Sequence, residues 1–201
     1  MSMELVFEDA ALGASLSTHE GFLERAEADA LLAWMLERAP WQREAPVMFG
    51  VVREVRRRTC AFGEAGRSYR YSGIERRAEP WPELLRPVVE RVRSLCATRF
   101  DFALANYYPD GEAALGKHAD DERDIVAGSA IAGLSLGAER DFVLYRKGPR
   151  GERVASVALA HGSLVVMWGT TQQHFVHAVP ARKRVQSPRV SLTFRAMSLY
   201  R

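Results

Sequence analysis

The second half of the chain consists of short segments of strand length, and this pattern restricts the fold more than any other feature of the sequence. Seven such segments follow one another after residue 100, and turn residues such as those of "KGPRG" (147–151) separate them. Almost no helical periodicity interrupts them. A hundred residues of this kind predict a β-sandwich or barrel. The segments are 101–108, 130–136, 141–146, 154–160, 163–168, 174–179 and 189–197.

Two segments in the first half have the periodicity of helices. Residues 22–39 place apolar side chains at mostly helical spacing and end before Pro40. Residues 82–100 form a second apolar stripe, and Pro87 is expected near its start, because an interior proline would remove a hydrogen bond. Residues 40–81, in which aromatic residues and arginines are interleaved, are expected to be irregular or hairpin-like. We therefore expect one α+β domain with both helices on one face of the β core.

The bulk composition is that of a soluble globular protein, with 47% hydrophobic and 26% charged residues. The longest apolar stretches, such as 163–168, have the length of strands, so neither a membrane span nor a membrane partner is expected. The N-terminus lacks the basic start and apolar run of a secretory signal. Cys60 and Cys96 lie too far apart for a CxxC zinc site, and a reducing, cytoplasmic compartment is the expectation.

Arginine gathers in three parts of the chain, at 53–58, 67–77 and 182–189. The formal net charge is only +3, so the clustering says more about partners than the total does. Two interpretations stay open at this point. The clusters are solvated faces, or they are the footprint of an anionic polymer such as a nucleic acid.

The segment "RVSLTFR" (189–195) alternates in a way that separates its two faces. Val190, Leu192 and Phe194 share one face and are expected in the core. If solvent covers the opposite face, nothing follows from it. If that face lines the inside of a barrel, its two arginines need anions, and a dicarboxylate would satisfy both. The residues of the opposite face are Arg189, Ser191, Thr193 and Arg195.

The segment "GKHADDERD" (116–124) crowds acidic side chains behind one histidine, which suggests a nearby cation. His118 and Asp120 are two residues apart, so on an extended segment both side chains face the same way. A distant histidine would complete three ligands on one side of a metal. His174 and His177 have an odd spacing, so at most one of them points inward. Two imidazoles and one carboxylate suit non-haem Fe(II) that binds a cosubstrate and dioxygen. Zinc uses the same ligands, so the spacing alone does not exclude a zinc hydrolase.

Together these segments resemble the AlkB-type 2-oxoglutarate- and Fe(II)-dependent dioxygenases. The resemblance is strongest to the branch of the second mammalian AlkB homologue, which repairs alkylated bases in duplex DNA. It implies a single domain, 1–201, with a double-stranded β-helix (jelly-roll) core over 101–201 and helices plus a nucleotide-recognition lid over 1–100. The motifs that carry it, in fixed order, are "NYYPDGEAALGKHADDERD" (106–124), "GLSLGAERDF" (133–142), "LAHGSLVVM" (159–167), "HAVP" (177–180) and "PRVSLTFR" (188–195), with a looser match at "VMFG" (47–50) and "FGEAGRSYRYSG" (62–73).

The resemblance also implies the cofactors Fe(II), 2-oxoglutarate and dioxygen. The iron ligands would be His118, Asp120 and His177, the last because "HAVP" occupies the family's ligand position. Arg189 would pair with the distal carboxylate of 2-oxoglutarate, and the arginine six residues later would lie near the keto-acid end. Position 191 departs from the family, which usually has asparagine there. The implied 2-oxoglutarate contacts are Asn106, Tyr108, Arg189, Ser191, Thr193 and Arg195.

Substrate contacts are implied mainly by the lid. A flipped base needs aromatic faces to stack on, and an apolar finger tip such as "VMFG" would fill the gap that the base leaves. The basic run at 56–58 would hold phosphates. Arg56 stands where that branch has a proline, so the loop is expected to differ in shape. The implied substrate contacts are Phe49, Arg57, Tyr69, Tyr71, Ser72, Asp121 and Glu122.

The activity implied is oxidative demethylation of N-alkylated bases, such as 1-methyladenine and 3-methylcytosine in DNA, with release of formaldehyde. The finger favours duplex DNA as the partner, while single strands, RNA or a protein substrate remain alternatives. A non-catalytic nucleic-acid-binding module is the rival hypothesis. It is disfavoured because a pure binder needs neither the metal ligands nor the two arginines. We expect a monomer.

Overall fold

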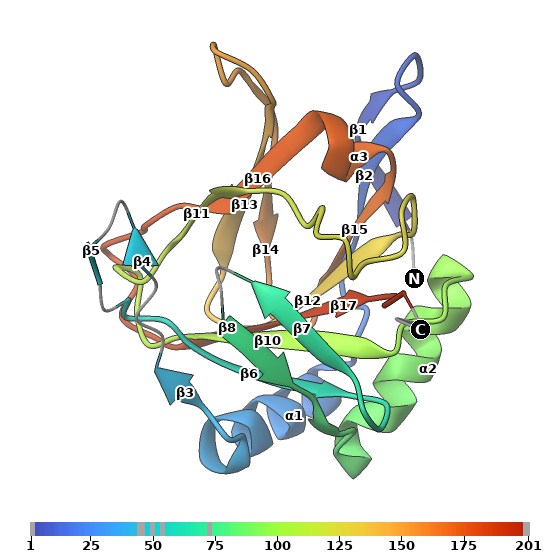
Figure 1. Ribbon diagram of the computed structural model, residues 1–201. Coiled ribbons are helices and arrows are strands. Elements are labelled where there is room, and N and C mark those ends of the chain that lie inside the picture. The colour runs from blue at the N-terminus through green and yellow to red at the C-terminus, as the bar shows by residue number, and fades with distance from the viewer. Residues whose placement is uncertain (1–2, 44–46, 49–50, 53–54, 72–73, 199–201) are drawn as a thin grey trace.

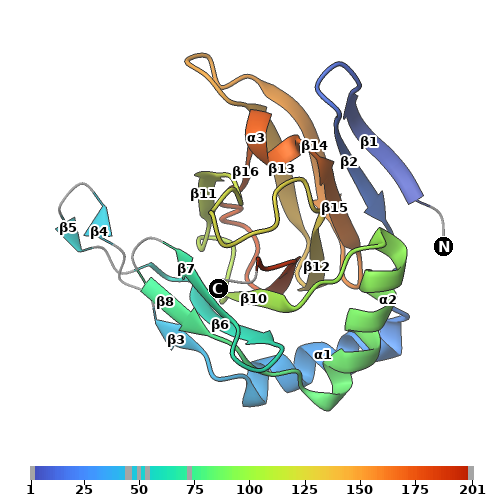
Figure 2. The ribbon, with the colours of Figure 1, turned by 45° about the vertical axis from the view of Figure 1, so that its right-hand side comes forward.

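The structure of the protein, a computed structural model, describes residues 3–43, 47–48, 51–52, 55–71 and 74–198. Two sheets face each other, and two helices cover the outer side of the larger sheet (Figures 1 and 2). The larger sheet runs in the order β1 (Met3–Asp9), β2 (Ala14–His19), β15 (Leu164–Gly169), β12 (Ile131–Gly137), β17 (Arg189–Arg195), β10 (Phe102–Tyr108), β6 (Arg58–Gly63) and β3 (Gln42–Arg43), with β9 (Glu79–Pro80) parallel to β6. The smaller sheet runs in the order β11 (Leu115–His118), β16 (Phe175–Val179), β13 (Arg140–Arg146) and β14 (Arg153–Leu159).

From β10 onward the chain passes back and forth between the two sheets. The strands β10, β12, β15 and β17 belong to the larger sheet, and β11, β13, β14 and β16 to the smaller one. This is the arrangement of a double-stranded β-helix, and it confirms the predicted jelly-roll core. Each of the seven predicted strands is present, with bounds within two residues of those predicted.

Both predicted helices are present, and the second ends earlier than the sequence suggested. The first is α1 (Arg25–Arg38), and the second begins as a 3-10 turn, η1 (Glu83–Leu85), that continues into α2 (Arg86–Cys96). Pro87 lies in the first turn of α2, as expected. The helix does not continue to residue 100, because Ala97 adopts a left-handed conformation with φ of 46° that closes its end.

The hydrophobic core has two layers, one on each face of the larger sheet. The outer layer packs α1 and α2 against the sheet, and Val190, Leu192 and Phe194 of β17 are fully buried in it. The inner layer lies between the sheets and includes Phe102, Leu144 and Phe175. The alternation of β17 therefore turns Arg189, Ser191, Thr193 and Arg195 toward the space between the sheets, where they line a cavity.

Strands from residues before 101 extend the larger sheet. The sequence had placed only helices and a lid in that part of the chain. The hairpin β1–β2 extends the larger sheet beyond β15, and β6 pairs with β10 on its other side. There are two short ribbons, β4 (Val47–Met48) with β5 (Val51–Val52) and β7 (Ser68–Tyr71) with β8 (Ile74–Arg77). The second lies beside β6, and the first projects from the edge of the fold (Figure 2). No helix in the described ranges is long and apolar enough to cross a membrane.

Candidate active site

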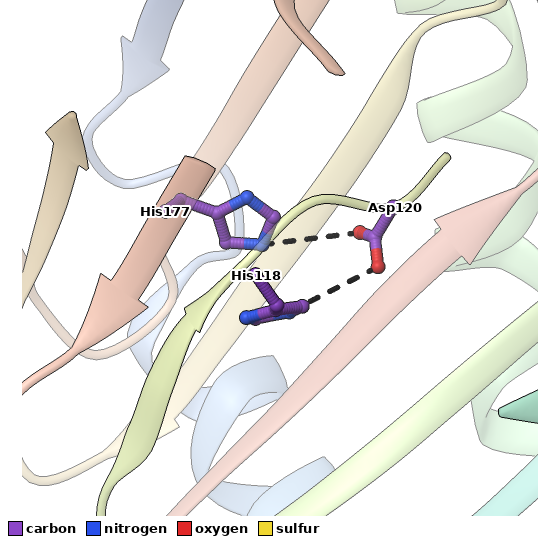
Figure 3. Close-up of side chains that lie close together, drawn as sticks. All are labelled: His118, Asp120 and His177. Carbon is purple, nitrogen blue, oxygen red and sulfur yellow. Dashed lines mark ion pairs between the residues drawn. The ribbon is translucent and has the colours of Figure 1, made fainter. Parts of the chain in front are cut away.

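Three side chains, two from the smaller sheet and one from the segment after β11, meet at one end of the cavity (Figure 3). His118 ends β11, Asp120 follows two residues later, and His177 lies on the neighbouring strand β16. The pairing of β11 with β16 places His118 directly opposite His177, with ring centroids 4.2 Å apart. One nitrogen of each histidine and one oxygen of Asp120 all lie within 4.8 Å of one another. Such a group can share one metal ion.

The two imidazoles are prepared to donate electron pairs. Nδ1 of His118 lies 2.9 Å from the carbonyl oxygen of Gly116, so this nitrogen carries the proton and Nε2 is left to face Asp120. Burial lowers the pKa of His177 to about 3, with a further contribution from His118. His177 is therefore neutral at physiological pH, which is the state that binds metals.

Asp120 is held as a carboxylate from two directions. Burial alone would raise its pKa, but the Arg195 guanidinium, followed by the two imidazoles, lowers that pKa to about 2. Nη2 of Arg195 donates to Oδ1 over 2.7 Å, and Oδ2 lies 3.9 Å from Nε2 of His177. The backbone N–H of Asp120 donates to Oε1 of Gln172 over 2.9 Å. Both the charge and the orientation of this ligand are thus fixed by the protein.

The other end of the cavity is suited to an anion. Arg189 is 2% exposed, and its Nη2 donates to the hydroxyl of Ser135 over 2.8 Å. Its Nε and Nη1 meet no acceptor among the described residues, and neither does Oδ1 of Asn106 meet a donor there. Tyr108 places its ring 5.1 Å from the Arg189 guanidinium. Buried donors without partners are costly, so a ligand with a carboxylate fits this end.

The strand pairing explains why these groups converge. In the register of β10 with β17, Asn106 lies opposite Ser191 and Tyr108 lies opposite Arg189.

Three arginines and a single acidic residue line the cavity, so it favours an anion even before a metal adds its own charge. The residues present therefore fit both a divalent metal and a dicarboxylate. All nine residues predicted for metal and cosubstrate line this one cavity: Asn106, Tyr108, His118, Asp120, His177, Arg189, Ser191, Thr193 and Arg195.

The predicted substrate residues are less closely gathered. Arg57 is 8% exposed and lines the same cavity, rather than lying on the outer surface beside Arg56 and Arg58. Asp121 and Glu122 line a neighbouring cavity that meets the first at Asp120. Lys147 forms an ion pair with Asp121 at 2.7 Å.

Two predicted contacts belong to a ribbon, and two others are not described. Tyr69 and Tyr71 belong to strand β7, where they pair with Arg76 and Ile74 of β8. Phe49 and Ser72 fall outside the described residues. The roles of all these residues in substrate binding stay predictions.

Sequence reasoning missed three residues that support the site. Gln172 lies in the short helix α3 (Thr171–His174), within "TTQQH", where no motif marks it. Arg140 at the start of β13 is completely buried, although "GAERDF" looks like a surface turn. Ser135 alone had a usable signal, because it alternates with Leu134 and Leu136 and so faces the cavity side of β12.

Comparisons with known proteins agree with this geometry. The sequence matches the 2OG-Fe(II) oxygenase superfamily over residues 15–195. It is 43% identical over 154 residues to the DNA oxidative demethylase ALKBH2 of Mus musculus, covering 74% of this chain and 64% of that protein. The human ALKBH2 is 42% identical over 158 residues, covering 76% of this chain and 60% of that protein. The chain thus spans less than two thirds of the length of these relatives.

More distant relatives and solved structures point the same way. The alpha-ketoglutarate-dependent dioxygenase alkB homolog 3 of Mus musculus is 32% identical over 187 residues, covering 89% of this chain and 65% of that protein. The structure of OsALKBH1 superposes with a TM-score of 0.64 at 16% identity, covering 95% of this chain and 99% of that one, and so supports the fold. The chain therefore belongs to the 2OG-Fe(II) oxygenase superfamily, and Fe(II), 2-oxoglutarate and dioxygen are the cofactors of that family.

Proposed function

We propose that the protein is a 2-oxoglutarate- and Fe(II)-dependent dioxygenase that removes N-linked methyl groups from bases of DNA, such as 1-methyladenine and 3-methylcytosine, and releases formaldehyde. One observation carries the proposal. The His118, Asp120 and His177 group shares a cavity with Arg189, whose buried Nε and Nη1 lack an acceptor among the described residues. The names of the ALKBH2 relatives, DNA oxidative demethylases, support the choice of substrate.

The metal end of the proposed site consists of His118, Asp120 and His177. Iron and 2-oxoglutarate bound there supply the oxidation of a C–H bond by dioxygen, with conversion of the cosubstrate to succinate and carbon dioxide. The protein keeps both imidazoles ready to donate electron pairs and keeps Asp120 ionised through Arg195. Three ligands on one side leave the other metal positions to the reactants.

The cosubstrate end is proposed to consist of β10 and β17 side chains. Nε and Nη1 of Arg189 would bind the distal carboxylate as a charged fork. Asn106 and Tyr108 would hydrogen-bond 2-oxoglutarate from the neighbouring strand, with Ser191 and Thr193 completing the wall. Arg195 would have two roles. It would lie near the keto-acid end of 2-oxoglutarate, and it holds the Asp120 carboxylate in place by a hydrogen bond.

The substrate side of the proposal rests on the lid and on the acids after β11. Tyr69, Tyr71 and Ser72 would line the pocket of a flipped base, and Phe49 would fill the gap in the base stack. Asp121 and Glu122 would hydrogen-bond the base near the metal. Arg57 is proposed to contact the nucleotide from the cavity side, in keeping with its burial. Further parts of the proposal are a duplex DNA substrate, a monomeric protein and a cytoplasmic location.

A methylated oligonucleotide tests the proposal. The protein is first reconstituted with Fe(II) and 2-oxoglutarate under anaerobic conditions. Oxygen and an oligonucleotide with one 1-methyladenine are then added, and mass spectrometry of the base follows the methyl group. We expect loss of the methyl group, faster in duplex than in single-stranded DNA. Asp120→Ala and His177→Ala should abolish it. His174→Ala is the matched control, because His174 lies three residues before His177 and outside the metal group.

The outcomes separate the candidates. Demethylation only in the single strand would keep the enzyme and reject a duplex finger. Succinate formation without loss of the methyl group would indicate an RNA or protein substrate. Binding of the oligonucleotide without succinate would favour a non-catalytic nucleic-acid-binding module, and it would contradict the proposed activity.

A further inference from the structure

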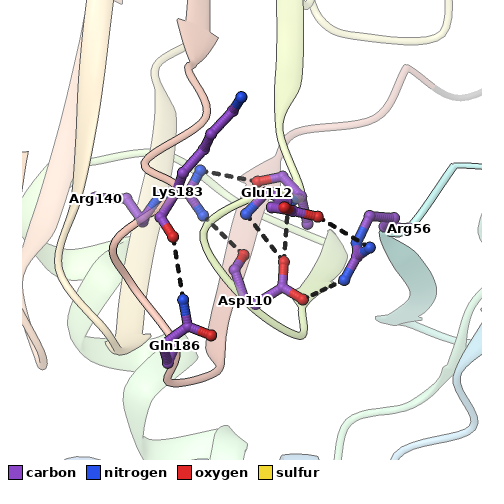
Figure 4. A network of polar contacts seen from close by, with 7 residues as sticks. Arg56, Asp110, Glu112, Arg140, Lys183 and Gln186 are labelled. Atoms are coloured by element: carbon purple, nitrogen blue, oxygen red, sulfur yellow. Dashed lines mark hydrogen bonds and ion pairs between the residues drawn. The ribbon is translucent and has the colours of Figure 1, made fainter.

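Arg140 is among the largest side chains that the described part of the fold buries completely, with 1% exposure, yet it does not line the cavity. It begins β13, and its guanidinium points to the turn between β10 and β11 and to the segment after β16 (Figure 4). Nη1 donates to the carbonyl oxygen of Asp110 over 3.3 Å. Nη2 donates to the carbonyl oxygens of Ala113 and Pro180 over 2.8 and 2.7 Å. These bonds tie Arg140 to the turn that directly follows Tyr108.

The charge of Arg140 is not matched by a bonded carboxylate among the described residues. The acids whose charges act on it, Asp141 and Asp110, are engaged by other arginines. Asp110 pairs with Arg56, and Asp141 pairs with Arg182 at 3.3 Å (Figure 4 shows the first pair). A buried guanidinium whose donors meet only carbonyl oxygens keeps an uncompensated charge. Burying this charge costs free energy, so we looked for a role of Arg140 beyond packing.

The aromatic ring of Tyr108 connects Arg140 to the cavity. The guanidinium carbon of Arg140 lies 5.7 Å from the centre of this ring, and that of Arg189 lies 5.1 Å from it. Burial lowers the pKa of Arg189, the Tyr108 side chain acts in the opposite direction, and the charge of Arg140 again lowers that pKa. Two buried positive charges therefore lie close together at the anion end of the cavity. An anionic group beside Arg189 would relieve both of them.

We propose that Arg140 is a positioning residue for the dicarboxylate cosubstrate and acts through Tyr108 and Arg189. Its hydrogen bonds hold the turn after Tyr108, and its charge adds to that of Arg189 in attracting a second carboxylate. The inference rests on the proposed function, because it takes 2-oxoglutarate as the ligand of the cavity. A purely structural residue would affect all 2-oxo acids equally. Arg140 should instead contribute to the preference for a ligand with two carboxylates.

The test compares two ligands that differ only in the distal group. Calorimetry measures the dissociation constants of 2-oxoglutarate and of 2-oxopentanoate, which has a methyl group in place of the distal carboxylate. The full chain is loaded with Mn²⁺ and kept free of oxygen, so no turnover is needed. Arg140→Gln keeps amide donors without the charge, and Arg140→Lys keeps the charge. Arg25→Met is the matched control, because it removes an exposed arginine of α1 that pairs with Asp29 and takes no part in the surroundings of Arg140.

We expect Arg140→Gln to reduce the preference for 2-oxoglutarate over 2-oxopentanoate by about tenfold. A unit charge acting across roughly 10 Å at an effective dielectric constant of about 20 gives an effect of this order. Arg140→Lys and Arg25→Met should keep the preference near that of the unchanged protein.

Other outcomes would overturn the inference. Equal weakening of both ligands in Arg140→Gln would leave Arg140 with a structural role alone. If that variant lacks a cooperative melt, Arg140→Met takes its place, and failure of both neutral variants to fold would assign Arg140 to the fold and reject the proposal. An unchanged protein that binds both ligands equally would contradict the proposed function instead, so the two failures are distinguishable.

Discussion

Arg195 and Asp120 form an ion pair that is almost fully removed from solvent, with side chains 3% and 2% exposed. Arg195 ends β17 of the larger sheet, Asp120 follows β11 of the smaller sheet by two residues, and the double-stranded β-helix brings them together at the cavity. The guanidinium compensates the burial of the carboxylate and keeps its pKa at about 2. Asp120 is therefore ionised and ready to bind a cation. The charge of Arg195 offsets the free-energy cost of burying this carboxylate.

Replacing Arg195 should make the protein depend on its metal for stability. Arg195→Met leaves a buried carboxylate without its partner, and breaking such a pair costs about 3–5 kcal/mol. A bound divalent cation restores a positive charge beside Asp120. We therefore expect a lower melting temperature for the variant without metal, and a larger rise on addition of Mn²⁺ than in the unchanged protein. Equal rises in scanning calorimetry would show that Arg195 does not compensate Asp120.

Gln172 should control metal affinity without being a ligand. Its side-chain oxygen accepts the backbone N–H of Asp120, and Gln172→Leu leaves that N–H without this acceptor. Loss of such a supporting contact typically weakens metal binding by about 10–100-fold. Titration with Mn²⁺, followed by electron paramagnetic resonance, measures the effect. Gln173→Leu, next along the chain, should bind Mn²⁺ as the unchanged protein does, and similar losses in both variants would refute the specific role.

Gly111 should tolerate no side chain, because the segment after β16 passes against it. A Cβ at this position would lie 1.8 Å from the carbonyl oxygen of Arg182, whose backbone N–H donates to the carbonyl oxygen of Gly111 over 2.7 Å. Gly111→Ala should destabilise the protein by about 1–3 kcal/mol or more. Denaturant unfolding measures this. Gly116→Ala is the control, since its Cβ meets nothing within 4 Å of the described structure, and a comparable loss there would contradict the steric argument.

The pair of Glu64 and Arg93 should add stability only above acidic pH. Arg93 donates to Glu64 over 2.7 Å, and this bond lowers the pKa of Glu64 below its usual value of 4.5. A lowered folded-state pKa contributes stability that is present above the unfolded value and is lost as the pH falls through the folded one. Because the Glu64 side chain is 43% exposed, solvent screens the pair, and the contribution should not exceed about 1 kcal/mol.

Comparing Glu64→Gln with the unchanged protein in urea at several pH values tests this. The variant should be less stable at neutral pH, and the difference should disappear once the pH is below the lowered pKa of Glu64. A difference that persists in acid would mean that charge is not its cause.

The sequence predicted those parts of the site that depend on local alternation. In β17 a period of two separates Val190 and Leu192 from Arg189 and Ser191, and the solvent-face alternative is wrong because the second sheet covers that side. The two-residue spacing of His118 and Asp120 likewise brought both side chains to one cavity.

Features that depend on contacts far apart in the chain were not predictable in this way. Arg140 lies next to two acidic residues in the sequence and has the pattern of a surface residue, but the turn at 110–113 and Pro180 enclose it. Arg57 stands among basic residues, which predicts phosphate contacts, but its place beside the cavity, just before β6, depends on the pairing of β6 with the distant strand β10. The hairpin β1–β2 joins the core only because β15, over 140 residues later, offers an edge.

The measurement that tests the central claim most directly is the balance of products in one reaction. The reconstituted protein is given an oligonucleotide with a single 1-methyladenine, and succinate, formaldehyde and restored adenine are quantified together. We predict that the three appear in equal amounts and that all three vanish in Asp120→Ala. Succinate and formaldehyde that form without restored adenine, or a methyl group that stays in place throughout, would contradict the assignment of this cavity to base demethylation.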